Sequence, residues 1–173
     1  MNKYLLGLLN STFMTWYYQT THPLEVGKPM AEVKKNFVED LPVVIGTEEQ
    51  QSSLVKIVDS ILLLCQKRHD GKRAFLNYIQ SAYEPKAITE KLECFDLLSF
   101  KDFCAELKKQ KVKLSASAQM DLLPLFDEKN KEVAAVTAQI KMLQLQLDEM
   151  VFQIYGIDSD SADRIRNEMV ITL

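Results

Sequence analysis

The sequence has few residues that interrupt helices and lacks the motifs of common enzymes. Only five Gly and five Pro occur among 173 residues, a composition that disfavours a sandwich of short strands joined by turns and favours long helices. There is no Gly-rich phosphate loop, nucleophile elbow, Asn-Pro-Pro-aromatic motif or nuclease set of carboxylates with a lysine. We therefore predict a mainly α, non-enzymatic chain with no catalytic residue.

Cysteine and histidine are also scarce. The three cysteines, Cys65, Cys94 and Cys104, match no zinc or redox spacing and lie among apolar residues, as expected of buried thiols in a reducing cytoplasm. The two histidines, His22 and His69, lie in polar segments without a ligand at metal-binding spacing. No run approaches the roughly 18 apolar residues that span a bilayer. We expect no metal, no cofactor, no membrane partner and a cytoplasmic location.

Acidic residues outnumber basic ones, because the net charge is −3 and the pI is near 5.5. Any nucleic-acid role would therefore need a local basic face. Carboxylate pairs such as Asp148 and Glu149 are expected on solvated helix surfaces. Basic residues form three clusters, at residues 34–35, 67–73 and 108–113, of which the last suits a helix C-terminus. The candidates for DNA phosphate contacts are Lys34, Lys35, Arg68, Lys72 and Arg73.

The longest regular pattern is a heptad seam near the C-terminus, with apolar residues at alternating intervals of three and four, which predicts a long helix that packs on another helix. A shorter stripe with the same spacing lies in the helix that begins after Thr47, where Gln50 completes a capping box. We predict that the two stripes form an antiparallel pair within the chain, the alternative being a homodimer through the longer seam. The seam residues are Leu54, Ile57, Ile61, Leu64, Val133, Val136, Ile140, Leu143, Leu147, Met150 and Ile154.

The remaining elements follow from caps and breakers. We expect an apolar helix over residues 4–18, a polar loop over 20–40, a short strand over 41–45, and no assigned structure between Glu84 and Leu98. The other helices are expected at 48–68, 72–83, 99–113, 118–155 and 158–169. Gly71 is expected to end the first of these and Gly156 the fourth, which Pro124 could also interrupt. Ser99 is the expected cap of the third, which ends at the lysines of 108–113. The expected fold is a helical bundle, with a first part over 1–46 and a helical domain over 47–173.

Five short segments are similar to one family. KYLLGLLNS (residues 3–11), VKKNFVEDLP (33–42) and EEQQ (48–51) resemble the end of a TaqI-like target-recognition domain, where the recognition part leads into a helical spacer. FKDFCAEL (100–107) and LDEMVFQIYGI (147–157) are similar to the tail of large bacterial adenine-specific DNA methyltransferases and of restriction enzymes fused to them. The chain thus resembles the C-terminal part of a restriction-modification protein.

This resemblance implies several properties. The parent protein would be a restriction endonuclease or DNA methyltransferase that binds S-adenosylmethionine in an upstream domain, whereas this part would hold no cofactor. Its partners would be DNA, through the parent protein, and the upstream methyltransferase or recognition domain or other restriction-modification subunits. The alternative is a helical protein-interaction module with no DNA role. We expect the apolar segment 4–18 to be covered by something outside this chain or distant in it, and the resemblance favours the rest of a larger protein.

Overall fold

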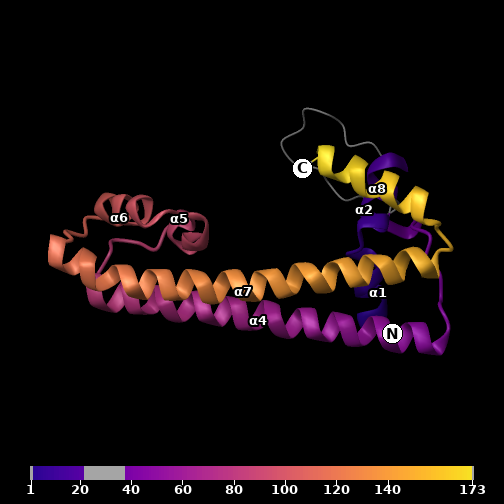
Figure 1. The fold of residues 1–173 in the computed structure, drawn as a ribbon, viewed down its shortest axis with the longest axis horizontal. Helices are drawn as coiled ribbons and strands as arrows, with labels where there is room; N and C mark the ends of the chain where they lie inside the picture. The colour runs from indigo at the N-terminus through magenta and orange to yellow at the C-terminus, as the bar shows by residue number, and fades with distance from the viewer. Residues whose placement is uncertain (1, 22–37, 173) are drawn as a thin grey trace. The chain divides into compact units, whose positions relative to one another are not determined.

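The computed structural model describes residues 2–21 and 38–172, and all regular structure in these ranges is helical (Figure 1). The mainly α fold class is therefore confirmed. The elements are α1 (Asn2–Leu9), α2 (Thr12–Thr21), α4 (Glu48–Tyr83), α5 (Glu90–Glu93), the 3-10 turn η1 (Phe95–Leu97), α6 (Phe100–Lys109), α7 (Ala116–Ile154) and α8 (Ser159–Thr172).

The chain divides into two compact units. Unit 1 consists of residues 1–61 and 142–173, and unit 2 consists of residues 62–141. Each unit contains one part of α4 and one part of α7, and in each the two helices pack side by side in antiparallel directions (Figure 1). This division does not follow the expected boundary after residue 46, because α1 and α2 share a core with the start of α4 and the end of α7.

The heptad stripes face the protein interior. Leu54, Val133, Val136, Ile140 and Leu147 are buried, and the other predicted seam residues are half-buried. None of them is exposed. Each buried Leu or Ile contributes about 1.5–3 kcal/mol before the loss of chain entropy, so packing along this seam stabilises both units. The half-buried seam residues are Ile57, Ile61, Leu64, Leu143, Met150 and Ile154.

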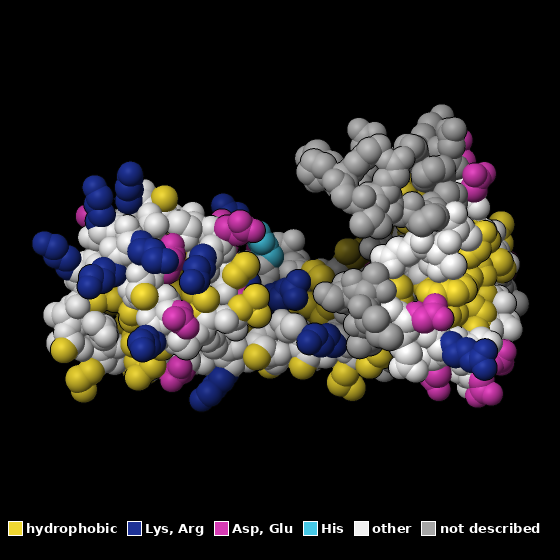
Figure 2. Space-filling model, turned by 90° about the horizontal axis from the view of Figure 1, so that it is seen from above, with side chains coloured by type: hydrophobic (Ala, Val, Ile, Leu, Met, Phe, Trp, Pro, Cys, Tyr) yellow, Lys and Arg dark blue, Asp and Glu magenta, His cyan; other side chains and the backbone are white. Residues whose placement is uncertain are grey.

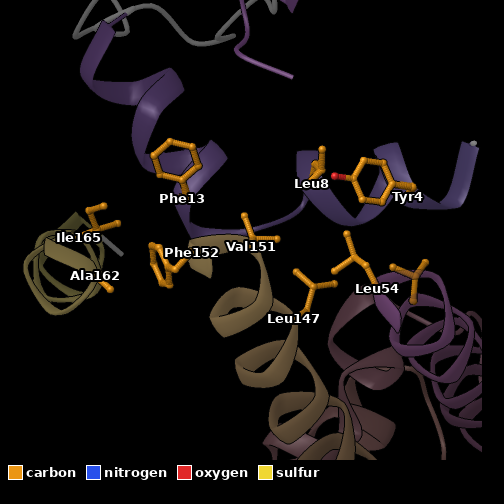
Figure 3. Packing of buried hydrophobic residues seen from close by; sticks show 10 residues of the cluster. Tyr4, Leu8, Phe13, Leu54, Leu147, Val151, Phe152, Ala162 and Ile165 are labelled. Atoms are coloured by element: carbon orange, nitrogen blue, oxygen red, sulfur yellow. The ribbon is translucent and has the colours of Figure 1, made fainter. Parts of the chain in front are cut away.

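The core of unit 1 joins segments that are far apart in the sequence. Tyr4 and Leu8 of α1 lie over Leu54 of α4, and Leu147 and Val151 of α7 complete the cluster (Figure 3). On the other side of α7, the same cluster extends to α2 and α8 through the residues Phe13, Phe152, Ala162 and Ile165. The apolar N-terminal segment is thus covered, at least in part, by helices of this chain.

The single helix expected over 4–18 is wrong, because the chain turns at Asn10 and Ser11. The buried Ser11 hydroxyl donates to the Leu8 carbonyl (2.7 Å) and accepts from the Met14 N–H (3.2 Å), so it caps the start of α2. Two helices at an angle present apolar residues to α4, α7 and α8 that one straight helix could not present.

The α2 N-terminus is also bound by a carboxylate from the distant end of the chain. Asp148 of α7 accepts hydrogen bonds from the Thr12 backbone N–H and from the Thr12 hydroxyl, both at 2.7 Å. Glu149 pairs with Arg166 of α8 at 2.8 Å. Glu149 lies on an exposed helix surface as expected, whereas Asp148 is half-buried, and both tie other helices to α7.

Residues 41–45, expected to form a strand, contain no strand. The segment has no regular secondary structure, and side chains rather than a neighbouring strand bind its backbone: the Tyr155 hydroxyl donates to the Pro42 carbonyl (2.5 Å) and the Tyr4 hydroxyl donates to the Val44 carbonyl (2.9 Å). The Tyr4 oxygen also accepts from the Gly46 N–H at 3.0 Å. The β-branched run typical of a strand is present in the sequence, but two tyrosines take the place of a partner strand.

The predicted end of the helix near Gly71 is wrong, since α4 continues without interruption to Tyr83. A glycine in a helix interior costs about 1 kcal/mol relative to alanine, which is less than the burial of Phe75 and Ile79 in the following turns contributes. The helix ends instead at Glu84, which has a left-handed backbone (φ 48), and at Pro85. The separate helix expected over 72–83 is the last part of α4.

The predicted capping residues of the other helices are confirmed. Thr47 and Gln50 form the reciprocal capping box (2.8 and 3.2 Å), and the Ser99 hydroxyl accepts from the Asp102 N–H. In α7 the potential break at Pro124 does not occur, because the neighbouring Leu122 and Phe126 are buried on the core side. Gly156 (φ 65) follows the end of α7, and α8 begins after the cap at Asp158.

The core of unit 2 is centred on four phenylalanines, one from each packed element. Phe75 of α4, Phe95 of η1, Phe103 of α6 and Phe126 of α7 are almost fully buried, and every pair of ring centroids lies between 4.6 and 6.4 Å apart. Such aromatic pairs contribute about 0.5–1.5 kcal/mol beyond their buried area. Residues 84–98, which had no predicted structure, thus contribute Phe95 to the centre of this core.

Candidate functional site

Three of the five predicted DNA-contact residues, Arg68, Lys72 and Arg73, lie in the described part of the chain. Lys34 and Lys35 lie outside the described residues. Arg68 is half-buried on α4, whereas Arg73 is exposed on the same helix. Lys72 lies 2.5 Å from Asp96 Oδ1 and 5.8 Å from the centre of the Phe95 ring. The Lys72 charge is therefore already compensated within unit 2, which leaves Arg73 as the exposed candidate of this cluster.

A groove along α4 and α7 in unit 2 contains Arg68. Its volume is about 840 Å³, and the small residues Gly71 and Ala135 leave it unfilled. A Cβ added to Gly71 would meet no atom within 4 Å. The charges on its walls are mixed, from Lys67 and Arg68 to Asp70 and Glu132, so the groove has no preference for one sign of ligand.

A second groove lies between α6 and the segment that leads into α7. We call it the lysine groove, because Lys101, Lys108 and Lys113 line it and all three side chains are exposed. None of the three forms an ion pair with a described residue. Its volume is about 560 Å³. The other lining residues are Phe100, Cys104, Ala105, Val112, Leu114 and Gln119.

The end of α6 determines the shape of the lysine groove. The Lys111 N–H donates to the Lys108 carbonyl (3.0 Å) and the Val112 N–H to the Leu107 carbonyl (3.1 Å), which is the hydrogen-bond pattern of a Schellman motif. Lys111 occupies the left-handed position with φ 70, where glycine is more common. The buried Val112 and Leu107 fix this turn to the core, so Lys113 returns beside α6.

Partial burial lowers the thiolate fraction of the one cysteine in the groove. Desolvation raises the pKa of Cys104 above its ordinary value of 9.0, so the protonated thiol dominates at neutral pH. Among the described residues, no base or oxyanion donor lies with it to form a nucleophilic site. Cys65, Cys94 and Cys104 are all free and half-buried, rather than fully buried as expected.

Glu106 holds α5 and α6 together beneath this surface. Its carboxylate accepts from Lys109 Nζ at 2.9 Å and from the Thr89 hydroxyl at 3.3 Å, and only 6% of the residue is exposed. The hydrogen bond from Lys109 lowers the pKa of Glu106 below its ordinary value of 4.5, although burial acts in the opposite direction. Lys109 is thus a structural residue, unlike the unpaired lysines of the groove.

The stability of the chain is expected to depend on Glu106 at acidic pH. Because the pKa of Glu106 is lower in the folded state, its ionised form stabilises the fold above about pH 4.5, and this contribution is lost as the pH falls through the folded-state pKa. Glu106→Gln should therefore show a shallower loss of the urea midpoint between neutral and acidic pH. Lys109→Gln, which removes the same bond from the other side, should behave similarly. Curves of the two variants parallel to that of the wild type would contradict this role.

The described part of the chain shows neither a cluster of metal ligands nor a membrane-spanning helix. No group of three or more potential metal-ligating side chains occurs in residues 2–21 and 38–172. In the same ranges, every helix is too short or too polar to cross a bilayer.

The structure adds Lys101 to the residues that the sequence had drawn attention to. The lysines of 108–113 were visible as a cluster, but they also fitted the end of a helix. Lys101 lies seven residues before Lys108 and therefore on the same face of α6. The turn at Lys111, which no glycine or proline marks in the sequence, then brings Lys113 to that face.

The chain belongs to a protein family described as a domain of unknown function (DUF8810), which matches residues 47–151. The match begins at the capping residue of α4 and ends in the last turn of α7, so the family comprises the helix pair with everything between its two helices. It does not include α1, α2 or α8. No curated protein and no solved structure matches the chain.

Proposed function

We propose that this chain is the C-terminal part of a cytoplasmic restriction-modification protein. In this proposal the helix pair positions a DNA-recognition domain and docks the methyltransferase domain or other subunits. The chain performs no catalysis and holds no cofactor itself, while the parent protein binds S-adenosylmethionine elsewhere. DNA is the partner of the whole assembly.

The supporting observation is that three of the five similar segments, residues 3–11, 33–42 and 147–157, are joined in unit 1 by hydrogen bonds of their own or directly neighbouring residues, whereas residues 100–107 lie in unit 2. Thr12, which follows the LLNS sequence of α1, is bound by Asp148 of the LDEMVFQIYGI sequence. Tyr155, also in the LDEMVFQIYGI sequence, donates to the carbonyl of Pro42, the last residue of VKKNFVEDLP. Tyr4, in the KYLLGLLNS sequence, donates to the carbonyl of Val44, two residues further along. Segments that are more than 100 residues apart thus form one hydrogen-bonded cluster, as expected if they belong together as parts of one recognition domain and its spacer.

The proposal is tested by the DNA methylation of the source cells. A strain in which residues 47–151 are deleted in frame should lose N6-methyladenine at one sequence motif, as measured by single-molecule sequencing of genomic DNA. The matched control is a strain that carries Lys56→Gln, an exposed position on α4, and its methylation should match that of the wild type. An unchanged pattern of methyladenine in the deletion strain would contradict the proposal.

Exposed apolar side chains favour a second candidate, a helical protein-interaction module without a DNA role. Leu63 of α4 is 71% exposed, and Met142 and Leu145 of α7 are 63% and 62% exposed. Side chains of this kind are common at protein interfaces. If this candidate is correct, the purified chain forms a homodimer or captures a partner helix, and the methylation pattern does not depend on it. Sedimentation velocity distinguishes a monomer from a dimer directly.

A further inference from the structure

The basic residues are unevenly distributed between the two units. Unit 2 contains 14 Lys and Arg against 11 Asp and Glu, a net charge of +3, although the whole chain has −3. The rest of the chain contains 7 Lys and Arg against 13 Asp and Glu. Unit 2 therefore provides the local basic face that a nucleic-acid role requires in an acidic chain.

Within unit 2 the positive side chains are most concentrated on α6 and the turn that follows it. Figure 2 shows Lys and Arg side chains spread across this end of unit 2, with acidic side chains among them. In the segment 100–114 there are five lysines against two acids. Of these acids, Glu106 is bound to Lys109 and Thr89, and Asp102 accepts from the Ser99 hydroxyl. Both acids are thus engaged locally.

We infer that the lysine groove and the basic face around it bind the phosphate backbone of duplex DNA. Lys101 and Lys108 lie about 10 Å apart along the α6 axis, a distance over which a duplex presents several phosphates. Lys113 supplies a third ammonium group from the opposite wall. The side chains make no competing ion pair with described residues, so each is available to replace a counterion. The choice of DNA as the polyanion rests on the proposed function.

The distribution of charge favours a polyanion over an acidic protein segment. Lys86 and Lys91 are also exposed toward α5, where Glu84, Glu90 and Glu93 are exposed beside them. A single acidic peptide seated in a groove of about 560 Å³ would use only the nearest lysines. A duplex, which carries charge along its whole length, can contact all of them. Such contacts position a protein on DNA without reading its sequence.

The inference is tested by binding to a mixed-sequence duplex of about 20 base pairs, measured by fluorescence anisotropy from low to moderate salt. We expect binding at low salt with a strong dependence on salt concentration. Changing Lys101, Lys108 and Lys113 together to Gln should weaken binding at least about 30-fold at low salt and reduce the slope of log K against log salt by about 2–3. The matched control changes Lys56, Lys131 and Lys141, which are exposed and do not line the groove, and should keep most of the affinity. Circular dichroism verifies that both triple variants remain folded.

A second measurement locates the DNA. In a chain with Cys65→Ser and Cys94→Ser, the remaining thiol is Cys104 in the lysine groove. Saturating duplex should slow the labelling of Cys104 by a thiol reagent several-fold. Absence of binding at low salt, equal weakening by both triple variants, or unchanged labelling of Cys104 under saturation would each overturn the inference. Binding of poly-glutamate in preference to DNA, with dependence on the same lysines, would overturn it in favour of an acidic protein partner.

The two proposals can fail separately. If deletion of residues 47–151 abolishes methylation but the chain does not bind DNA, the proposed function stands and the groove is not a DNA site. If the chain binds DNA through the lysine groove but methylation is unaffected, the groove is a DNA site in a protein of another function.

Discussion

Phe103→Ala is expected to lower the free energy of unfolding of unit 2 by about 3–5 kcal/mol, the usual cost of removing a fully buried aromatic ring. The Phe103 side chain has no exposed surface, and its ring lies 5.0 Å from Phe126, 5.8 Å from Phe75 and 6.3 Å from Phe95. Its loss would leave a cavity where α4, η1, α6 and α7 meet. Urea unfolding followed by circular dichroism measures the change.

Phe100→Ala is the matched control for this substitution. Phe100 lies on the same helix but is half-buried, and its ring contacts that of Phe126 at 5.4 Å. A smaller loss, of about 1–2 kcal/mol, is expected because less apolar area is returned to water. If Phe103→Ala cost no more than Phe100→Ala, the four-ring cluster would not be the main core of unit 2.

The second large effect is expected at Asp148. Asp148→Ala should destabilise unit 1 by about 2–3 kcal/mol, because it removes two charge-assisted hydrogen bonds and leaves the Thr12 N–H without its acceptor. It also removes a negative charge from the N-terminus of α2, where the helix dipole favours one. The measurement is again urea unfolding, at neutral pH.

Two further variants separate the contributions at this contact. Asp148→Asn keeps one carbonyl oxygen and should lose less stability than Asp148→Ala. Thr12→Val removes the hydroxyl donor alone, and the double variant with Asp148→Ala should lose less than the sum of the two single changes, since both act on the same bond. Strict additivity would mean that the hydroxyl bond contributes nothing.

Much of the fold could be predicted because the spacing of apolar residues determines where the helices lie and which faces they pack. The seam residues from Val133 to Ile154 repeat every three or four positions, and only a helix places such residues on one face. The shorter stripe that begins at Leu54 has the same period and so could be matched with it. Caps at Thr47, Ser99 and Asp158 were recognisable because each has a short polar side chain at the start of a helix.

The errors arose where tertiary contacts outweigh local signals. Gly71 resembles a helix stop, but the burial of Phe75 in the next turn keeps α4 continuous. Residues 41–45 contain a β-branched run typical of a strand, yet the hydroxyls that bind them come from residues about 40 positions before and about 110 positions after. A single sequence does not show which distant side chain will reach a backbone carbonyl, so these partners could not be foreseen.

The candidate site was harder to predict than the fold, because a lysine run has the same appearance whether it caps a helix or binds a ligand. Lys72 and Lys109 turned out to be paired within unit 2, whereas Lys108 and Lys113 are unpaired. The difference depends on Asp96 and Glu106, whose positions follow from how η1, α5 and α6 pack. Sequence reasoning found the basic clusters but could not sort structural from available lysines.

The tyrosine contacts to residues 42–46 have a consequence for solubility. Val43, Val44 and Ile45 form an uncharged, β-branched run with exposed side chains, the composition of segments that aggregate by pairing with other chains. Such pairing needs free backbone carbonyls and N–H groups. Here Tyr155 and Tyr4 occupy the Pro42 and Val44 carbonyls, and Pro42 has no N–H to offer. The two hydroxyls therefore act as a built-in block against edge-to-edge association, in addition to their part in holding unit 1 together.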